Sequence, residues 1–173
     1  IENRYIPAGP TIIDEMANFA FWAGLMVGRP KEFDNIRKTM DFKDAKSNFI
    51  KAARYGSESI MMWMGEEIPV KDLVLNKLLP IAYSGLRKMK IHENDINRYL
   101  QIIENRVQRF TPAHWMIRNY RALKKNMKQD DALIALTKAI HQNQKTDIPV
   151  HGWPAIEIQP QATAVATKLG HIM

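Results

Sequence analysis

Glu2 and Arg4 are the two residues whose types and spacing most readily suggest chemistry. They lie in the run Ile1-Glu2-Asn3-Arg4-Tyr5-Ile6, in which apolar and polar residues alternate as in a β-strand. Side chains two positions apart on a strand point to the same face, so this carboxylate and this guanidinium would lie side by side. A carboxylate can bind Mg²⁺ and a guanidinium can hold a phosphoryl oxygen, which suits a metal–phosphate complex. An ion pair across an exposed sheet face explains the same spacing, and the Glu-x-Arg pattern alone favours that simpler interpretation.

The rest of the sequence lacks the common catalytic signatures. It contains no P-loop, no dinucleotide-binding fingerprint and no nucleophile elbow. Because it has no cysteine, disulfides, thiolate metal sites and cysteine nucleophiles are excluded. The five histidines do not have the spacing of metal ligands, so a histidine zinc site is not expected. They are His92, His114, His141, His151 and His171.

The charge of the chain suggests an anionic partner. The 25 Lys and Arg exceed the 18 Asp and Glu, giving a net charge of +7 and a pI near 9.6. Nucleic acid, a membrane surface and a phosphate-bearing ligand would all fit this excess. One basic stretch also contains aromatic residues, a combination that can bind single strands, although a solvated helical face with its aromatics in the core is the simpler explanation. Its members are Arg98, Tyr99, Arg106, Arg109, Phe110, Trp115, Arg118, Tyr120, Arg121, Lys124, Lys125 and Lys128.

The length and composition fit an ordinary globular domain, but the strand and the two ends suggest a part of a larger protein. The 173 residues, 46% of them hydrophobic, are enough for a sizeable core. A strand at 1–6 needs partners that the following hundred residues do not supply, so the sheet is expected upstream. The longest charge-free run, 16–28, is too short to span a bilayer and predicts a helix buried on most sides.

The remaining pattern is mostly helical. Capping residues predict helices that begin at Thr11 (with Asp14 in capping-box spacing), Asp41, Glu93 and the pair Thr111-Pro112. The second of these has an apolar stripe that repeats at helical spacing, namely Phe42, Ala45, Phe49 and Ala52.

The segments between and after these helices are predicted as follows. A hairpin or extended excursion is expected over 59–70. A long helix is expected over 73–89, with a kink at Pro80. A last helix begins near Asp130, and extended chain follows Asp147.

Several segments resemble the late catalytic-domain region of bacterial glutamate–cysteine ligase-like proteins, which are ATP-dependent carboxylate–amine ligases. The resemblance covers roughly residues 1–157 and depends on the order of its motifs. They are Glu2-Asn3-Arg4, Pro7 to Asp14, Ala17-Asn18, Ala20-Phe21, Gly24-Leu25, Tyr99-Leu100, Ile103 to Val107, Thr111 to Trp115 and Pro149 to Pro154.

The end of the chain resembles the opening of a CBS domain. Val165, Leu169 and the pair Ile172-Met173 match the apolar positions at which such domains begin. Ligase-like proteins fused to CBS domains exist. The resemblance therefore implies a ligase-like domain over 1–157 and a linker with the start of a CBS domain over 158–173.

The resemblance implies an activity and a small set of site residues. Glu2 is similar to a Mg²⁺ ligand of the family, and Arg4 to the contact for the transferred phosphoryl group. Arg106 lies in a family-like segment and is a candidate substrate-binding residue, with an ion pair near Glu104 or Glu93 as the alternative. The family usually has glycine before the threonine and glycine or serine after it, whereas this chain has Phe110 and Pro112. These residues remove backbone freedom, which argues against a role that needs a flexible loop closing over the substrate.

The sequence thus predicts a mostly α-helical slice of an α+β protein, whose helical layer packs on an antiparallel catalytic sheet. The implied reaction joins the γ-carboxylate of glutamate to an amine, with ATP and Mg²⁺ as cofactors. A homo-oligomer in the cytoplasm is expected, with adenine nucleotide as a possible ligand of downstream CBS domains and with no nucleic-acid or membrane partner. A non-catalytic, nucleotide-sensing scaffold is the alternative, and a basic helical nucleic-acid binder is a third hypothesis.

Overall fold

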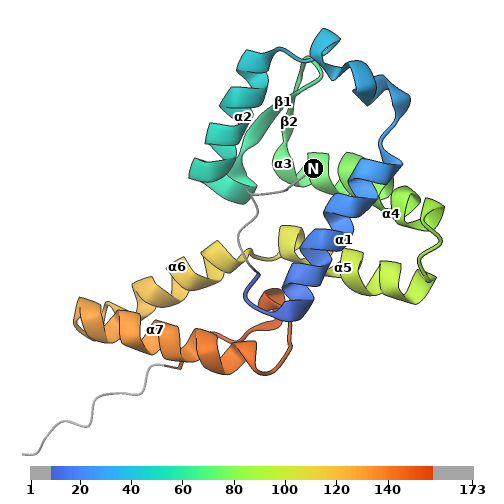
Figure 1. Cartoon of the computed structure of the whole chain (residues 1–173). Helices are drawn as coiled ribbons and strands as arrows, with labels where there is room; N and C mark the ends of the chain where they lie inside the picture. Colours follow the sequence, from blue (N-terminus) through green and yellow to red (C-terminus); the bar gives the residue numbers. More distant parts are fainter. Residues whose placement is uncertain (1–8, 158–173) are drawn as a thin grey trace, which may run out of the picture.

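The computed structural model describes residues 9–157, which are mostly helical (Figure 1). The strand expected at 1–6, with Glu2 and Arg4, lies outside this range, as do the expected linker and CBS segment at 158–173. The α-helices are α1 (Ile12–Gly28), α2 (Phe42–Tyr55), α3 (Val70–Asp72), α4 (Leu79–Lys88), α5 (Glu93–Gln108), α6 (Pro112–Leu123) and α7 (Gln129–Gln144). Shorter helical turns are η1 (Lys31–Lys38), η2 (Gly56–Glu58), η3 (Leu73–Leu78) and η4 (Val150–Gly152), and the strands are β1 (Ile60–Trp63) and β2 (Glu66–Pro69).

The first core lies between α1, α4 and α5. The N-cap of α1 is Thr11, as the sequence predicts, and the helix ends at Gly28, two residues before Pro30. Small residues let α1 and α4 approach closely: a Cβ atom on Gly85 would collide with the carbonyl oxygen of Gly24. The buried members of this core are Ala17, Ala20, Leu79, Ala82, Leu86, Ile96, Leu100, Ile102 and Ile103.

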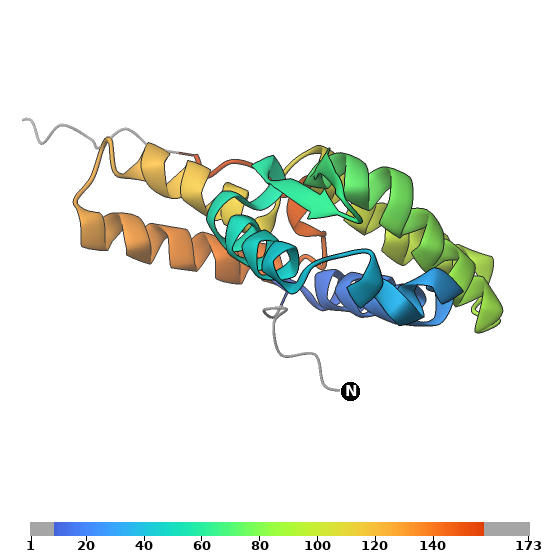
Figure 2. The same cartoon turned by 90° about the horizontal axis from the view of Figure 1, so that it is seen from above.

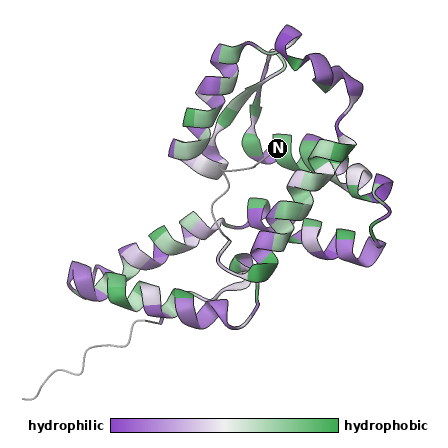
Figure 3. Cartoon of the chain, viewed as in Figure 1, coloured by the Kyte–Doolittle hydropathy of each residue, from purple (hydrophilic) through white to green (hydrophobic). Residues whose placement is uncertain are grey.

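One face of α1 is more exposed than the sequence predicts. Apolar residues occur along most of the length of α1 (Figure 3), which is why burial on most of its sides was expected. The structure shows instead that Ile12 is 75% exposed and Phe19 60% exposed, with Met16 and Val27 exposed beside them. The expectation is wrong for this face because α4 and α5 pack against the other side of α1, where the alanines and glycines lie.

The helix α2 packs against the β1–β2 hairpin. The expected hairpin is confirmed: the two strands are antiparallel, with Met61 opposite Ile68. Met64 and Gly65 form its turn, both with positive φ (51° and 87°), as a two-residue hairpin turn requires. The side chain of Asn48 fastens α2 to β1, because it accepts a hydrogen bond from the backbone N–H of Met62 and donates one to the carbonyl of the same residue.

The chain passes from the hairpin into α4 through a π-helical segment. The sequence predicts a single long helix kinked at Pro80, and the structure shows α3, the π-helical η3 and then α4, with Pro80 in the first turn of α4. Proline lacks the N–H that would continue the regular helical ladder. The regular α-helix is therefore interrupted just before Pro80, where the structure has the wider turns of a π-helix.

A second core joins α6, α7 and η4. Views from two directions show α6 and α7 as an antiparallel pair that extends away from α1 and α4 (Figures 1 and 2). The indole rings of Trp115 and Trp153 meet edge to face, with centroids 5.0 Å apart. Leu123, Ala132, Leu136 and Val150 complete the buried set. The mostly helical class is confirmed, and the sheet of residues 9–157 consists of the two hairpin strands. No helix in this range is long and apolar enough to cross a membrane.

Candidate functional site

Of the three predicted site residues, Arg106 lies within the described residues 9–157. Glu2 and Arg4 lie outside the described residues, and the chain that follows them enters α1 through Thr11. Arg106, the third predicted site residue, lies in the last turn of α5. The structure brings Arg106 to the first turns of α1, so the part of the predicted site that the structure describes lies there.

Thr11 and Asp14 form a reciprocal cap that is entirely buried. The hydroxyl of Thr11 accepts a hydrogen bond from the backbone N–H of Asp14 (3.1 Å) and donates one to Oδ2 of Asp14 (2.9 Å). Thr11 is 1% exposed and Asp14 is fully buried. A capping residue normally lies at the helix surface, so the burial of this one indicates a further role for the Asp14 carboxylate.

That role is to anchor two distant parts of the chain. Nη2 of Arg106 lies 2.7 Å from Oδ1 of Asp14, and Nη1 of Arg106 donates to the side-chain oxygen of Asn18. The backbone N–H of Val150 donates to Oδ2 of Asp14 (3.1 Å). One carboxylate therefore connects α1 with α5 and with η4, which is 136 positions away in sequence. We call Thr11, Asp14, Asn18, Arg106 and the N–H of Val150 the polar node.

His151 lies beside the polar node and feels its charges. Burial lowers the pKa of this histidine, and the nearby cations Arg109 and Arg106 lower it further, while Asp14 acts in the opposite direction. Nδ1 of His151 and Nε of Arg106 are both buried and have no hydrogen-bond partner among residues 9–157. A neutral imidazole fits this position better than a charged one, because burial chiefly disfavours the charged form.

A second set of hydrogen bonds fastens the extended chain after α7. The indole N–H of Trp115 donates to the carbonyl of Pro154 (2.9 Å). The side chain of Asn119 donates to the carbonyl of Trp115 and accepts from the N–H of Ile156. The segment 149–156 is thereby held against α6 as well as against the polar node.

The node is suited to holding structure in place rather than to turning over a substrate. The Asp14 carboxylate accepts three hydrogen bonds, all from donors of this chain. The guanidinium of Arg106 donates to Asp14 and to Asn18. Neither Glu104 nor Glu93 is the partner of Arg106, and Glu93 pairs with Arg87 instead. The substrate role of Arg106 stays a prediction. In residues 9–157 no three Asp, Glu or His side chains gather as metal ligands would.

The basic stretch of α5 and α6 is mostly helix surface. Arg98 lies over the ring of Tyr99, Arg118 over Phe110 and Lys124 over Tyr120, each between 5.6 and 5.8 Å from the ring centroid. Trp115 is 1% exposed and belongs to the second core. The aromatics are thus covered by the neighbouring cations or by the core, which weakens the nucleic-acid hypothesis for this stretch.

Sequence reasoning found only part of this site. The capping pattern identified Thr11 and Asp14, but nothing local indicated that Arg106 would be the partner of Asp14. Asn119 was missed altogether, because a lone asparagine within a helix has no characteristic spacing. Comparison of the chain with protein-family models, with curated proteins and with solved structures finds no match. The function must therefore be inferred from the residues and their arrangement.

Proposed function

We propose that this chain is the C-terminal part of a glutamate–cysteine ligase-like catalytic domain, which forms an amide from glutamate and an amine. The observation that carries the proposal is the convergence of segments that resemble this family. Thr11 to Asn18, Arg106 and Val150 meet in the polar node, and Trp115 meets Trp153 and Pro154 beside it. Segments that act together in one domain are expected to converge in this way.

In the proposed reaction, the γ-carboxylate of glutamate attacks the terminal phosphoryl group of ATP. This step forms an acyl phosphate and releases ADP. The amine nitrogen then attacks the acyl carbon, the C–O bond to phosphate breaks, and the amide and inorganic phosphate leave after the amine loses a proton. Charge on the phosphoryl oxygens is what a protein must stabilise in such a transfer.

The residues of this chain would contribute in two ways. Arg4 would contact the phosphoryl oxygens and Glu2 would supply one carboxylate to Mg²⁺, while the other ligands would come from residues outside 9–157. The polar node would fix the position of the chain that follows these two residues, since Thr11 and Asp14 are buried and fully bonded. Precise placement of reacting groups contributes much of the rate of such a reaction.

The test is a turnover assay on the natural full-length chain that contains these residues. ADP release is measured with MgATP and glutamate against a panel of amines, with Glu2→Gln as the variant. We expect glutamate- and amine-dependent turnover that falls by about a hundredfold or more in the variant, the range seen when a group that stabilises transition-state charge is removed. Glu15→Gln, at an exposed carboxylate of α1, is the matched control and should retain full activity.

Two results would count against the proposal. The absence of glutamate-dependent ADP release with every amine would overturn it. Turnover that is unchanged in Glu2→Gln would remove Glu2 from the site, and an unaltered cellular function of that variant would favour the non-catalytic scaffold.

A further inference from the structure

The outer side of α2 combines an apolar stripe with a row of cations. Phe42 is 81% exposed and Phe49 67% exposed, and Ala45 and Ala52 share their stripe at helical spacing. The helical spacing of this stripe is confirmed, and α2 has no buried residue. The hairpin packs against the other side of the helix, where Asn48 lies.

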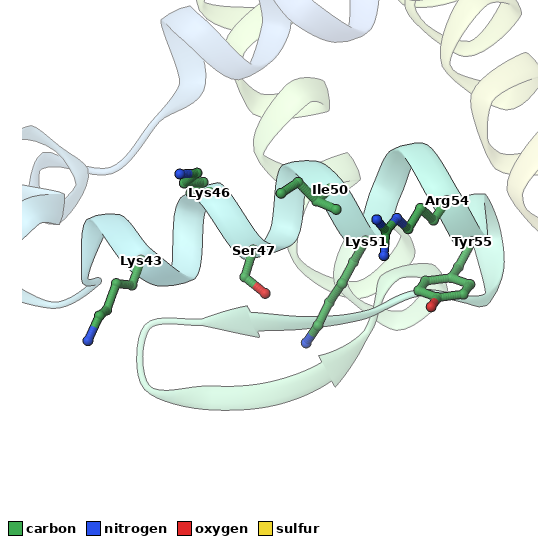
Figure 4. Close-up of a pocket in the computed structure, with 7 residues that line it drawn as sticks. All are labelled: Lys43, Lys46, Ser47, Ile50, Lys51, Arg54 and Tyr55. Carbon is green, nitrogen blue, oxygen red and sulfur yellow. The ribbon is translucent and has the colours of Figure 1, made fainter.

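Lys46 borders this stripe, and the other three cations of α2 lie farther round the helix. Lys43, Lys46, Lys51 and Arg54 line an open hollow of about 440 Å³ along α2, together with Ser47, Ile50 and Tyr55. Figure 4 shows their side chains spread along the whole helix, with Lys43 and Lys51 extending toward the hairpin and Lys46 away from it. None of these four cations takes part in the ion pairs found within residues 9–157. The helix itself contains one carboxylate, Asp44.

The helix is already formed and held in place. The side chain of Asp41 caps its N-terminus by accepting a hydrogen bond from the N–H of Lys43 (2.8 Å). Asn48 fastens it to β1, and the hydroxyl of Ser59 donates to the carbonyl of Lys51 (2.9 Å). A partner that binds α2 therefore does not need to pay the entropy of ordering it.

We propose that α2 lies against the surface of an anionic lipid bilayer, with Phe42 and Phe49 inserted at the headgroup boundary and the cations on the lipid headgroups. A basic helix with aromatic residues on its apolar side is the kind of helix that binds in the plane of such an interface. With Phe42 and Phe49 buried at the interface, Lys46 beside them and the long side chains of the cations on the flanks of the helix can reach the headgroups. The proposal differs from the sequence-based expectation of no membrane partner, which stays a prediction.

Two other occupants fit less well. A polynucleotide would neutralise the cations, but of the residues that line their hollow Tyr55 alone has a ring on which a base could stack, because Phe42 and Phe49 lie outside it. A second copy of this chain packed through the apolar stripe about a two-fold axis would bury the phenylalanine rings but leave most of the cations without a partner, since they lie farther round the helix.

The test is flotation of the full chain with phosphatidylserine–phosphatidylcholine vesicles and with phosphatidylcholine vesicles alone. We expect binding to the anionic vesicles, weakening at high salt, and little binding to the neutral ones. Replacing Lys46 and Arg54 by glutamate should lower the partition coefficient by at least about twentyfold, since each cation near such a surface contributes about fivefold. Phe42→Ser with Phe49→Ser should lower it by at least about tenfold.

The matched control changes the same number of charges elsewhere. Lys125→Glu with Lys128→Glu alters two exposed lysines that follow α6 and should leave vesicle binding within about twofold of the parent chain. Circular dichroism of every variant confirms that the fold is kept. The proposal is overturned if the anionic vesicles do not bind, if the α2 variants bind as the parent does, or if the control loses as much binding as they do. Salt-sensitive binding to RNA or DNA without vesicle binding would overturn it in favour of the polynucleotide.

Discussion

The polar node and the outer side of α2 use charge in opposite ways. In the node, the side chains of Asp14 and Arg106 are 0% and 12% exposed, and the carboxylate accepts from three donors of the chain itself. On α2, four cations are spread over a solvent-facing hollow and pair with no carboxylate of residues 9–157. A buried charge must be satisfied within the fold, so it becomes structural, whereas an exposed one remains free to meet a partner. The comparison predicts large stability effects at the node and small ones on α2.

The largest effect is expected from Asp14→Ala. This substitution leaves Arg106 buried without its carboxylate and removes the acceptor of Thr11 and of the Val150 N–H. Breaking one side of a buried ion pair typically costs about 3–5 kcal/mol. Urea unfolding followed by circular dichroism measures the loss.

A double-mutant cycle makes this test specific to the pair. Arg106→Met alone should also destabilise, and Asp14→Ala with Arg106→Met should cost clearly less than the sum of the two single changes. Glu93→Gln is the control, because it breaks the exposed Arg87–Glu93 pair and should leave the unfolding midpoint nearly unchanged. Additive costs in the cycle would mean that the two charges do not interact as the geometry indicates.

A smaller effect is expected from protonation of His151. Its pKa is lowered in the folded chain, chiefly by burial, whereas in the unfolded chain it titrates near 6.5. Between these two values the unfolded chain binds more protons, so stability rises with pH through this window. The contribution is therefore complete above about pH 6.5 and is lost as the pH falls through the folded pKa.

Thermal melts across this range test the assignment. In His151→Gln, the melting temperature should fall less between about pH 7.5 and 5 than in the parent chain, by a few degrees. His141→Gln, at an exposed position of α7, is the matched control. An unchanged slope in His151→Gln would show that folding does not lower the pKa of this imidazole.

The sequence predicts most of the helices because their signals are local. Thr11, Asp41 and the pair Thr111-Pro112 begin helices as their capping chemistry indicates, and the hairpin follows the expected extended segment. Local signals also explain why η1 was missed, since Lys31–Lys38 is short and mostly polar, with Phe33 and Ile36 as its apolar residues.

The node and the α2 surface could not be predicted because both depend on distant contacts. The Asp14–Arg106 pair joins residues 92 positions apart, and no local pattern specifies such a partner. For α2, the stripe containing Phe42 and Phe49 has the periodicity of a core-facing helix. Periodicity shows that a helix has an apolar side, but not what that side meets.

The smallest effect is expected from Phe42→Ser with Phe49→Ser, and it tests the exposed half of the comparison. Removing two phenylalanine rings from a core would cost several kcal/mol. At sites that are 81% and 67% exposed, little area is returned to water, so the free energy of unfolding should change by no more than about 0.5 kcal/mol per site. Urea unfolding of the same chain used for vesicle flotation measures this directly. A loss of more than about 2 kcal/mol would show that the stripe is covered in the folded protein. Unchanged stability together with lost vesicle binding would separate the two roles, because the rings would then stabilise the bound state and not the fold.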